Sequence, residues 1–326
     1  MLLRPLLATP LLLASRLLFA QTADHALCDR LATPSSREQF RPQAERLIAA
    51  GGAAADFVRG CLAWDDARPD AAIEHFERAA ASPGAPSDFH LWLGNAYGVK
   101  AQRANPLSQA RLARKTKGAF DRAVQLDGDN IQARDGLMQY YMLAPSIVGG
   151  SMQKAEEQAR EIKRRNAYAG GLALATLAGR RKDAAAAERE LAALHRTFPD
   201  SIGALSALLN LHTQQKQWAE GWAVLDAAGR GRLATHPRLL FLVGRMAALS
   251  GQQLDRGEAA LTAYVARSPG RGEPRLTSAQ LRLAQLHEKQ GKTEQARAAY
   301  RAAIALDGKN DEARKGLKAL EARQGS

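Results

Sequence analysis

The residues of this chain that could carry acid–base, nucleophilic or metal chemistry are few and dispersed. The chain has two cysteines and seven histidines, and the histidines are spread along its length. No His-Glu-x-x-His motif, Gly-x-Ser-x-Gly turn or Walker-type phosphate loop occurs in it. The adjacent Asp65 and Asp66 diverge on a helix, because neighbouring positions do not share a face. The sequence therefore predicts a protein that is not an enzyme and that holds no metal and no cofactor.

The N-terminal segment predicts export. Arg4 supplies a positive charge, residues 6–20 are mostly apolar, and a cleavage site follows Ala20. The alternative is a buried N-terminal helix. We expect a signal peptide over residues 1–20, an exported protein of the bacterial periplasm, and no transmembrane span once the signal is removed.

Export gives the two cysteines a structural meaning. Cys28 and Cys61 both lie in the expected mature chain, and in an oxidising compartment they can form one disulfide. The alternative is a pair of buried free thiols. No Cys-x-x-Cys motif or Cys/His cluster points to a metal site. The sequence favours a Cys28–Cys61 bridge.

The chain is strongly basic, with a formal net charge of +13 at pH 7. A positive field of this size favours anionic partners such as lipid headgroups, glycans or acidic peptides. The alternative is that the arginines are spread over solvated helix faces and recognise nothing. No dense basic run occurs in the sequence, so we do not expect a nucleic-acid partner.

A pattern of apolar and small residues recurs through most of the chain. In the segment His-Leu-Trp-Leu-Gly-Asn-Ala-Tyr, Leu93, Gly94 and Tyr97 fill the Leu, Gly and Tyr positions of the pattern W-x2-L-G-x2-Y. Leu283 and Ala284 begin a second clear match. The chain thus resembles the tetratricopeptide-repeat family, and in particular its exported bacterial members. The resemblance implies an all-α fold: a right-handed superhelical solenoid of stacked antiparallel helix pairs.

The resemblance also implies a domain organisation. We expect N-terminal helices over residues 21–52, about seven repeats over residues 53–310, and a polar C-terminal capping helix over residues 311–326. Two repeats are longer than the pattern, with insertions near residues 100–115 and 143–151.

Insertions in consecutive repeats emerge on the same edge of a solenoid, so we expect these two loops to be neighbours. Pro145 should end the preceding helix at about Ala144, and Gly149 and Gly150 permit a sharp turn. The resulting edge is basic and tyrosine-bearing, and its residues are Arg103, Arg111, Arg114, Lys115, Lys117, Tyr140 and Tyr141. It is either a ligand-recognition edge or a loop packed over an irregular repeat junction.

The resemblance further implies a peptide-binding groove on the concave face, lined by the first helix of each repeat. The residue two positions after the Leu position should face this groove. These residues are Asn95, Gln139, Thr176, Asn210, Arg245 and Gln285. All six are polar, as suits a peptide backbone, although solvent-facing helix positions are usually polar as well.

We therefore expect a scaffold or adaptor of the cell envelope that binds a protein or peptide in its groove. The alternative is a binder of anionic lipid or glycan through the basic edge, and a lesser alternative is an enzyme subunit or a cryptic enzyme.

Overall fold

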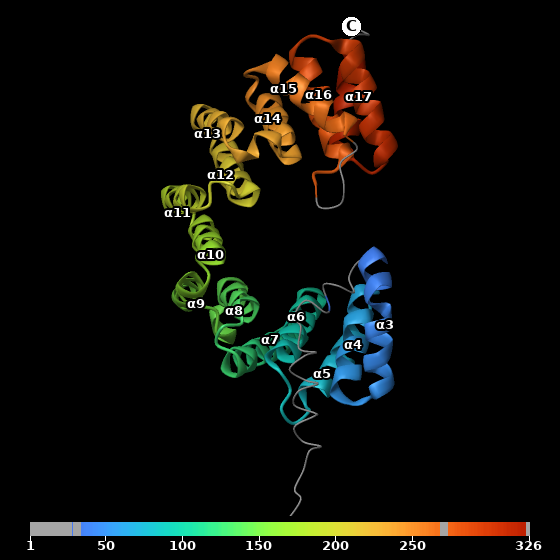
Figure 1. Ribbon diagram of the computed structural model, residues 1–326, viewed down its shortest axis with the longest axis vertical. Coiled ribbons are helices and arrows are strands. Elements are labelled where there is room, and N and C mark those ends of the chain that lie inside the picture. The colour runs from blue at the N-terminus through green and yellow to red at the C-terminus, as the bar shows by residue number, and fades with distance from the viewer. Residues whose placement is uncertain (1–27, 29–33, 268–272, 324–326) are drawn as a thin grey trace, which may run out of the picture. The chain divides into compact units, whose positions relative to one another are not determined.

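The computed structural model describes residue 28, residues 34–267 and residues 273–323 of the chain. The described residues form helices joined by turns and contain no strand, so the predicted all-α class is confirmed. The chain divides into two compact units, Met1–Leu177 and Ala178–Ser326 (Figure 1). The predicted signal peptide, residues 1–20, lies outside the described residues.

Unit 1 is built from consecutive helices that pack pairwise, with α4 against α5, α6 against α7, and α8 against α9. Its elements are α3 (Pro34–Ala50), α4 (Gly52–Asp65), α5 (Pro69–Ala80), α6 (Ser87–Arg103), α7 (Pro106–Leu126), α8 (Ile131–Leu143), the 3-10 helix η1 (Ser146–Val148), α9 (Met152–Arg165) and most of α10 (Ala167–Arg180).

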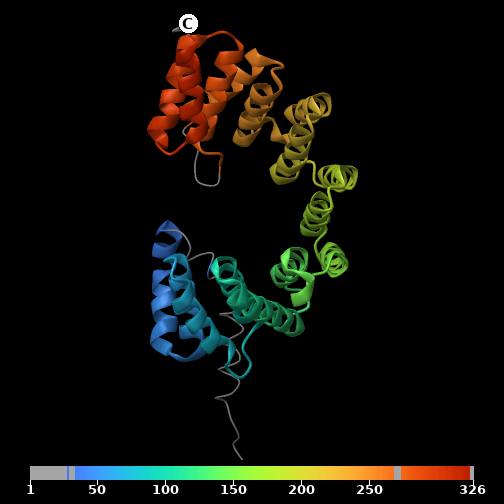
Figure 2. The same ribbon diagram turned by 180° about the vertical axis from the view of Figure 1, so that it is seen from behind.

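Unit 2 repeats the same arrangement, with α12 against α13, α14 against α15, and α16 against α17 (Figure 2). Its elements after the end of α10 are α11 (Ala184–Thr197), α12 (Ile202–Gln215), α13 (Trp218–Arg230), the 3-10 helix η2 (Arg232–Thr235), α14 (Pro237–Ser250), α15 (Leu254–Ala266), α16 (Leu276–Lys289), α17 (Thr293–Leu306) and α18 (Asp311–Ala322). The last helix, α18, buries only Ala313 and Leu320, and charged residues occupy most of its other positions, as expected of a cap on the end of a helical stack.

Glycines on the first helix of a pair let a large side chain from the second helix approach the backbone. The ring of Phe120 on α7 lies between two of them: a Cβ atom added at Gly94 on α6 would be 2.7 Å from the ring, and one added at Gly136 on α8 would be 2.6 Å from it. Gly60 on α4 likewise leaves room for the ring of Phe76 on α5. Gly94, which fills the Gly position of the repeat pattern, and Gly136 allow three helices to close around one aromatic ring.

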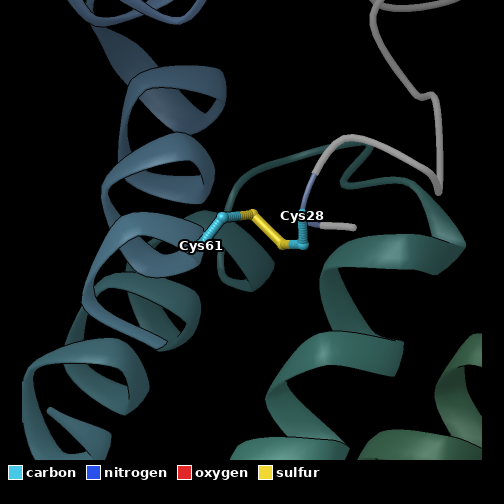
Figure 3. Close-up of a disulfide and its surroundings, with 2 residues drawn as sticks. All are labelled: Cys28 and Cys61. Carbon is cyan, nitrogen blue, oxygen red and sulfur yellow. A yellow bond between two sulfur atoms is a disulfide. The ribbon is translucent and has the colours of Figure 1, made fainter. Parts of the chain in front are cut away.

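A disulfide joins Cys28 to Cys61 on α4, the pairing that the sequence favours (Figure 3). The two Cα atoms are 4.9 Å apart, and both side chains are buried in the core of unit 1. The bridge closes a stretch of 33 residues and ties the start of the described chain to the first helix pair.

The insertion expected near residues 100–115 is not a loop. Its residues lengthen α6 to 17 residues and α7 to 21 residues, with a turn only at Ala104 and Asn105. Asn105 caps α7 by accepting a hydrogen bond from the Ser108 amide at 3.0 Å, and Pro106 occupies the first turn. The loop prediction was wrong because the inserted residues are mostly alanine, glutamine, leucine, arginine and lysine, which favour a helix.

The insertion near residues 143–151 does leave the helix. Leu143 is the last residue of α8, Pro145 comes two residues later, and Ser151 caps α9 by accepting a hydrogen bond from the Lys154 amide at 3.3 Å.

Among the residues that the structure describes, no helix is both long and apolar enough to cross a bilayer.

Candidate functional site

Unit 1 contains a concave pocket of about 1090 Å³. The helices α6, α7, α8 and α10 contribute most of its wall, and the turn after α8, together with Trp64 on α4 and Ile162 on α9, contributes the rest. Its floor is apolar and is formed by Leu91, Phe120, Met138 and Ile162, which belong to the core of unit 1. Small side chains on α7 and α10 keep the space above this floor open.

Three of the residues predicted to face a groove line this pocket. Asn95 lies on α6, Gln139 on α8 and Thr176 on α10, so three successive first helices each present one of them to the same space. The Thr176 hydroxyl donates to the Leu172 carbonyl of its own helix at 2.8 Å, which leaves its oxygen able to accept a further hydrogen bond. The pocket thus combines an apolar floor with amide and hydroxyl groups.

Asp135 is the one charged residue among the described residues that line the pocket. It lies on α8 one turn before Gln139, whose side chain hydrogen-bonds to it. Although Asp135 is exposed to solvent, the neighbouring pocket wall partly desolvates its carboxyl and raises the pKa, and this hydrogen bond opposes the increase. Sequence reasoning missed this residue, although its spacing of four from the predicted Gln139 places both side chains on one face of the helix.

Exposed aliphatic side chains at the pocket form an apolar rim. Leu143 and Ile147 line it and are 58% and 88% exposed, and Leu107, which follows the lining residue Pro106, is 86% exposed. Large aliphatic side chains this exposed are unusual when they gather around one concave site, and such patches mark interaction surfaces.

The turn after α8 is fixed by its own hydrogen bonds. Gly149 has a φ of 98°, which favours glycine, and a Cβ atom at Gly150 would lie 1.7 Å from the Ala144 carbonyl oxygen. The Tyr140 hydroxyl donates to the Val148 carbonyl, and the Ser151 amide donates to the Tyr141 carbonyl at 2.8 Å. The turn therefore folds back onto α8 and holds Ile147 at the pocket mouth.

The predicted basic edge differs from the structure in the placement of its two tyrosines. Tyr140 and Tyr141 are buried rather than exposed, and the ring of Tyr141 lies between the ammonium groups of Lys117 and Lys154 at 5.7 and 5.8 Å. The tyrosine-bearing ridge is thus wrong, because the hydroxyl of Tyr140 finds its partner inside the folded turn. The two insertions are neighbours, since the start of α7 and the turn after α8 line the same pocket.

The cations of that edge fall into two groups. Lys115 is 2.9 Å from Glu77 and Lys117 is 2.5 Å from Asp121, so both are paired. The other three are exposed on α6 and α7 and form no ion pair with a residue that the structure describes; they are Arg103, Arg111 and Arg114.

The remaining predicted groove residues lie in unit 2 and are already hydrogen-bonded. Arg245 donates to Asn210. Burial lowers the pKa of Arg245, and the charge of Arg282 lowers it further. Gln285 donates to Glu312 at 2.8 Å and accepts from Arg282 at 2.6 Å. These side chains therefore form a polar network of their own.

The described residues contain no group of three or more His, Cys, Asp or Glu side chains arranged to hold a metal ion. Two histidines, His212 and His287, are buried within helices α12 and α16 of unit 2. They are 3.5 and 3.9 Å from single glutamates, Glu188 and Glu258 respectively.

Comparison with protein-family models gives one match: residues 277–320, which span α16, α17 and most of α18, match the tetratricopeptide repeat. None of the curated proteins matches the chain in sequence. Among solved structures, a tetratricopeptide-repeat protein of Parabacteroides merdae is similar, with a TM-score of 0.48 and 14% identity over 82% of this chain and 98% of that one.

Two further solved structures are similar to this chain. PilW, a type IV pilus biogenesis factor, has a TM-score of 0.46 and 17% identity over 69% of this chain and 98% of its own. A thermophilic tetratricopeptide-repeat protein of Thermus thermophilus has a TM-score of 0.40 and 16% identity over 65% of this chain and 98% of its own. The resemblance predicted from the sequence is confirmed by the family match: residues 277–320, at the end of a chain built from helix pairs, match the tetratricopeptide repeat.

Proposed function

We propose that this chain is a non-enzymatic scaffold or adaptor of the cell envelope, and that the pocket of unit 1 binds a segment of a partner protein. Tetratricopeptide repeats are typical of protein-interaction scaffolds. The observation that carries the proposal is the placement of Asn95, Gln139 and Thr176 around one concave, apolar-floored pocket.

The chemistry of the pocket suits a polypeptide segment. Side-chain amides both donate and accept hydrogen bonds, so Asn95 and Gln139 can pair with the N–H and C=O groups of a peptide backbone. The apolar floor and rim gain free energy when aliphatic side chains displace water from them, at roughly 25 cal/mol for each Å² buried. Backbone recognition and side-chain burial are thus provided in the same space.

The envelope assignment rests on two features. The N-terminal sequence predicts a signal peptide, and disulfides such as Cys28–Cys61 persist in oxidising compartments. Both features are expected of a protein that acts in the periplasm.

A matched pair of tryptophan substitutions tests the pocket. Thr176 and Thr197 are both exposed helical threonines whose hydroxyls donate to the carbonyl four residues earlier, but only Thr176 lines the pocket. A random-peptide phage library is selected on the purified, disulfide-bonded protein. The selected peptides should bind the wild type and Thr197→Trp and lose binding to Thr176→Trp, which fills the pocket. Equal binding to the two variants, or no enrichment, would refute the proposal.

A second candidate function is binding to anionic lipid or glycan, favoured by the three unpaired arginines of α6 and α7. Vesicles containing phosphatidylglycerol should then bind the protein at low salt and release it as salt rises, because exposed charges are screened. Replacing Arg103, Arg111 and Arg114 together with alanine should abolish that binding. Binding that is unchanged in this variant would rule out the basic edge.

A further inference from the structure

Asp135 is an isolated acid in a basic protein. The chain has 46 Lys and Arg residues against 33 Asp and Glu residues, and carboxylates elsewhere in unit 1 such as Asp56, Glu77 and Asp129 have cationic partners. No Lys, Arg or His nitrogen lies within 4.0 Å of the Asp135 carboxylate among the described residues, and its polar neighbour is the amide of Gln139.

The surroundings of Asp135 provide no compensation either. The lining side chains contributed by α6, α7 and α10 include no titratable group, so the pocket contains one negative charge and no positive charge. Asp135 is exposed at the surface of the pocket, so its carboxylate is open to a cationic group that a ligand supplies. The pocket is therefore acidic, whereas the chain as a whole is basic.

The exposed aliphatic rim indicates which groups of a ligand would accompany a cationic group paired with Asp135. Leu143 and Ile147 line the pocket with exposed aliphatic surface, and Asp135 lines the same pocket. The volume of about 1090 Å³ exceeds the roughly 300–1,000 Å³ of most small-molecule sites. An occupant that satisfies both features is a length of chain with aliphatic side chains on either side of one basic side chain.

We infer that the pocket of unit 1 selects a partner segment that carries a lysine or arginine flanked by aliphatic residues, with the basic group paired to Asp135. This inference rests on the proposed function and names the class of peptide. Asp135 supplies the charge selection, and Gln139, one helical turn further on, orients the carboxylate through its hydrogen bond.

A second matched pair of variants tests the inference. Asp135→Asn removes the charge and keeps the shape, whereas Glu157→Gln removes a carboxylate on neighbouring α9 whose partner is also a glutamine amide and which does not line the pocket. The peptide library is selected on the wild type and on each variant. Peptides enriched on the wild type and on Glu157→Gln should share a basic residue between aliphatic ones, and that preference should vanish on Asp135→Asn.

The affinity of one selected peptide then gives the size of the effect. By calorimetry, Asp135→Asn should weaken the binding of this peptide about tenfold, the low end of what a hydrogen bond between charged groups contributes. The same peptide with its basic residue replaced by glutamine should bind the wild type and Asp135→Asn equally.

The two proposals fail in different ways. Peptides that bind in the pocket but show no basic preference, or a preference that survives in Asp135→Asn, would overturn the charge selection alone. A library that yields no binder blocked by Thr176→Trp would overturn the proposed function itself. Circular dichroism of each variant confirms that the helices are retained, so that loss of binding reports on the pocket.

Discussion

The close packing around Phe120 leads to a stability prediction with opposite signs at two glycines. Alanine in place of glycine normally stabilises a helix by about 1 kcal/mol. At Gly94 the new methyl group would lie 2.7 Å from the Phe120 ring, and the backbone of Gly136 limits the room for the ring to move, since a Cβ atom added there would lie 2.6 Å from it. Overpacking of this kind costs about 1–3 kcal/mol, and the gain in helix propensity offsets about 1 kcal/mol of it, so Gly94→Ala should lower the free energy of unfolding by up to about 2 kcal/mol.

Gly118 provides the control on the same helix as Phe120. It is exposed, and a Cβ atom added there would meet nothing within 4 Å, so Gly118→Ala should raise stability by about 0.5–1 kcal/mol. Urea unfolding followed by circular dichroism measures both variants as shifts of the midpoint at a common slope. Trimming the ring with Phe120→Leu should make Gly94→Ala less costly than it is alone, as contacting residues are coupled. Stabilisation by Gly94→Ala equal to that by Gly118→Ala would refute the packing account.

Three further predictions concern the disulfide and two carboxylates. Replacing Cys28 and Cys61 with serine should cost about 3–4 kcal/mol by the entropy of a 33-residue loop, seen as a lower melting temperature that reductant no longer changes. The hydrogen bond donated by Tyr97 and the charge of Lys115 hold the pKa of Glu77 below its ordinary 4.5. The ionised Glu77 therefore stabilises the fold at neutral pH, and this stabilisation is lost as the pH falls through the lowered pKa. The melting temperatures of the wild type and Glu77→Gln should converge in acid. The raised pKa of Asp135 has the opposite effect on stability, because the charged carboxylate destabilises the folded protein above that pKa. Asp135→Asn should therefore be more stable than the wild type at neutral pH, and the difference in melting temperature should shrink on acidification. A difference that stays constant with pH would contradict the assignment.

Short-range sequence signals predicted much of the fold and part of the site. The repeat pattern predicted the small residue Gly94 beside Phe120, and it predicted a concave face for Asn95, Gln139 and Thr176, which line one pocket. Pro145 and the following glycine pair predicted the turn after α8, because proline and glycine restrict or free the backbone locally.

Three features escaped prediction, each for its own physical reason. The inserted residues before Phe120 extend two helices because their helix propensity exceeds any tendency to form a loop, and the repeat pattern says nothing of this. Tyr140 is buried because its hydroxyl reaches a carbonyl in a turn whose path the sequence does not specify. Asp135 is polar like any exposed helix residue, and only the assembled pocket shows that it lacks a cation.

Site-specific photo-crosslinking in the producing cell tests the central claim, that the pocket of unit 1 binds a protein segment. Benzoylphenylalanine replaces Leu143 at the pocket rim or, as the control, Leu306 at the end of α17; both side chains are exposed aliphatics, at 58% and 52%. The account predicts a covalent adduct with one partner protein at position 143, mapped to a segment with a lysine or arginine between aliphatic residues, and none at position 306. No adduct at position 143, or the same adducts at both positions, would contradict it.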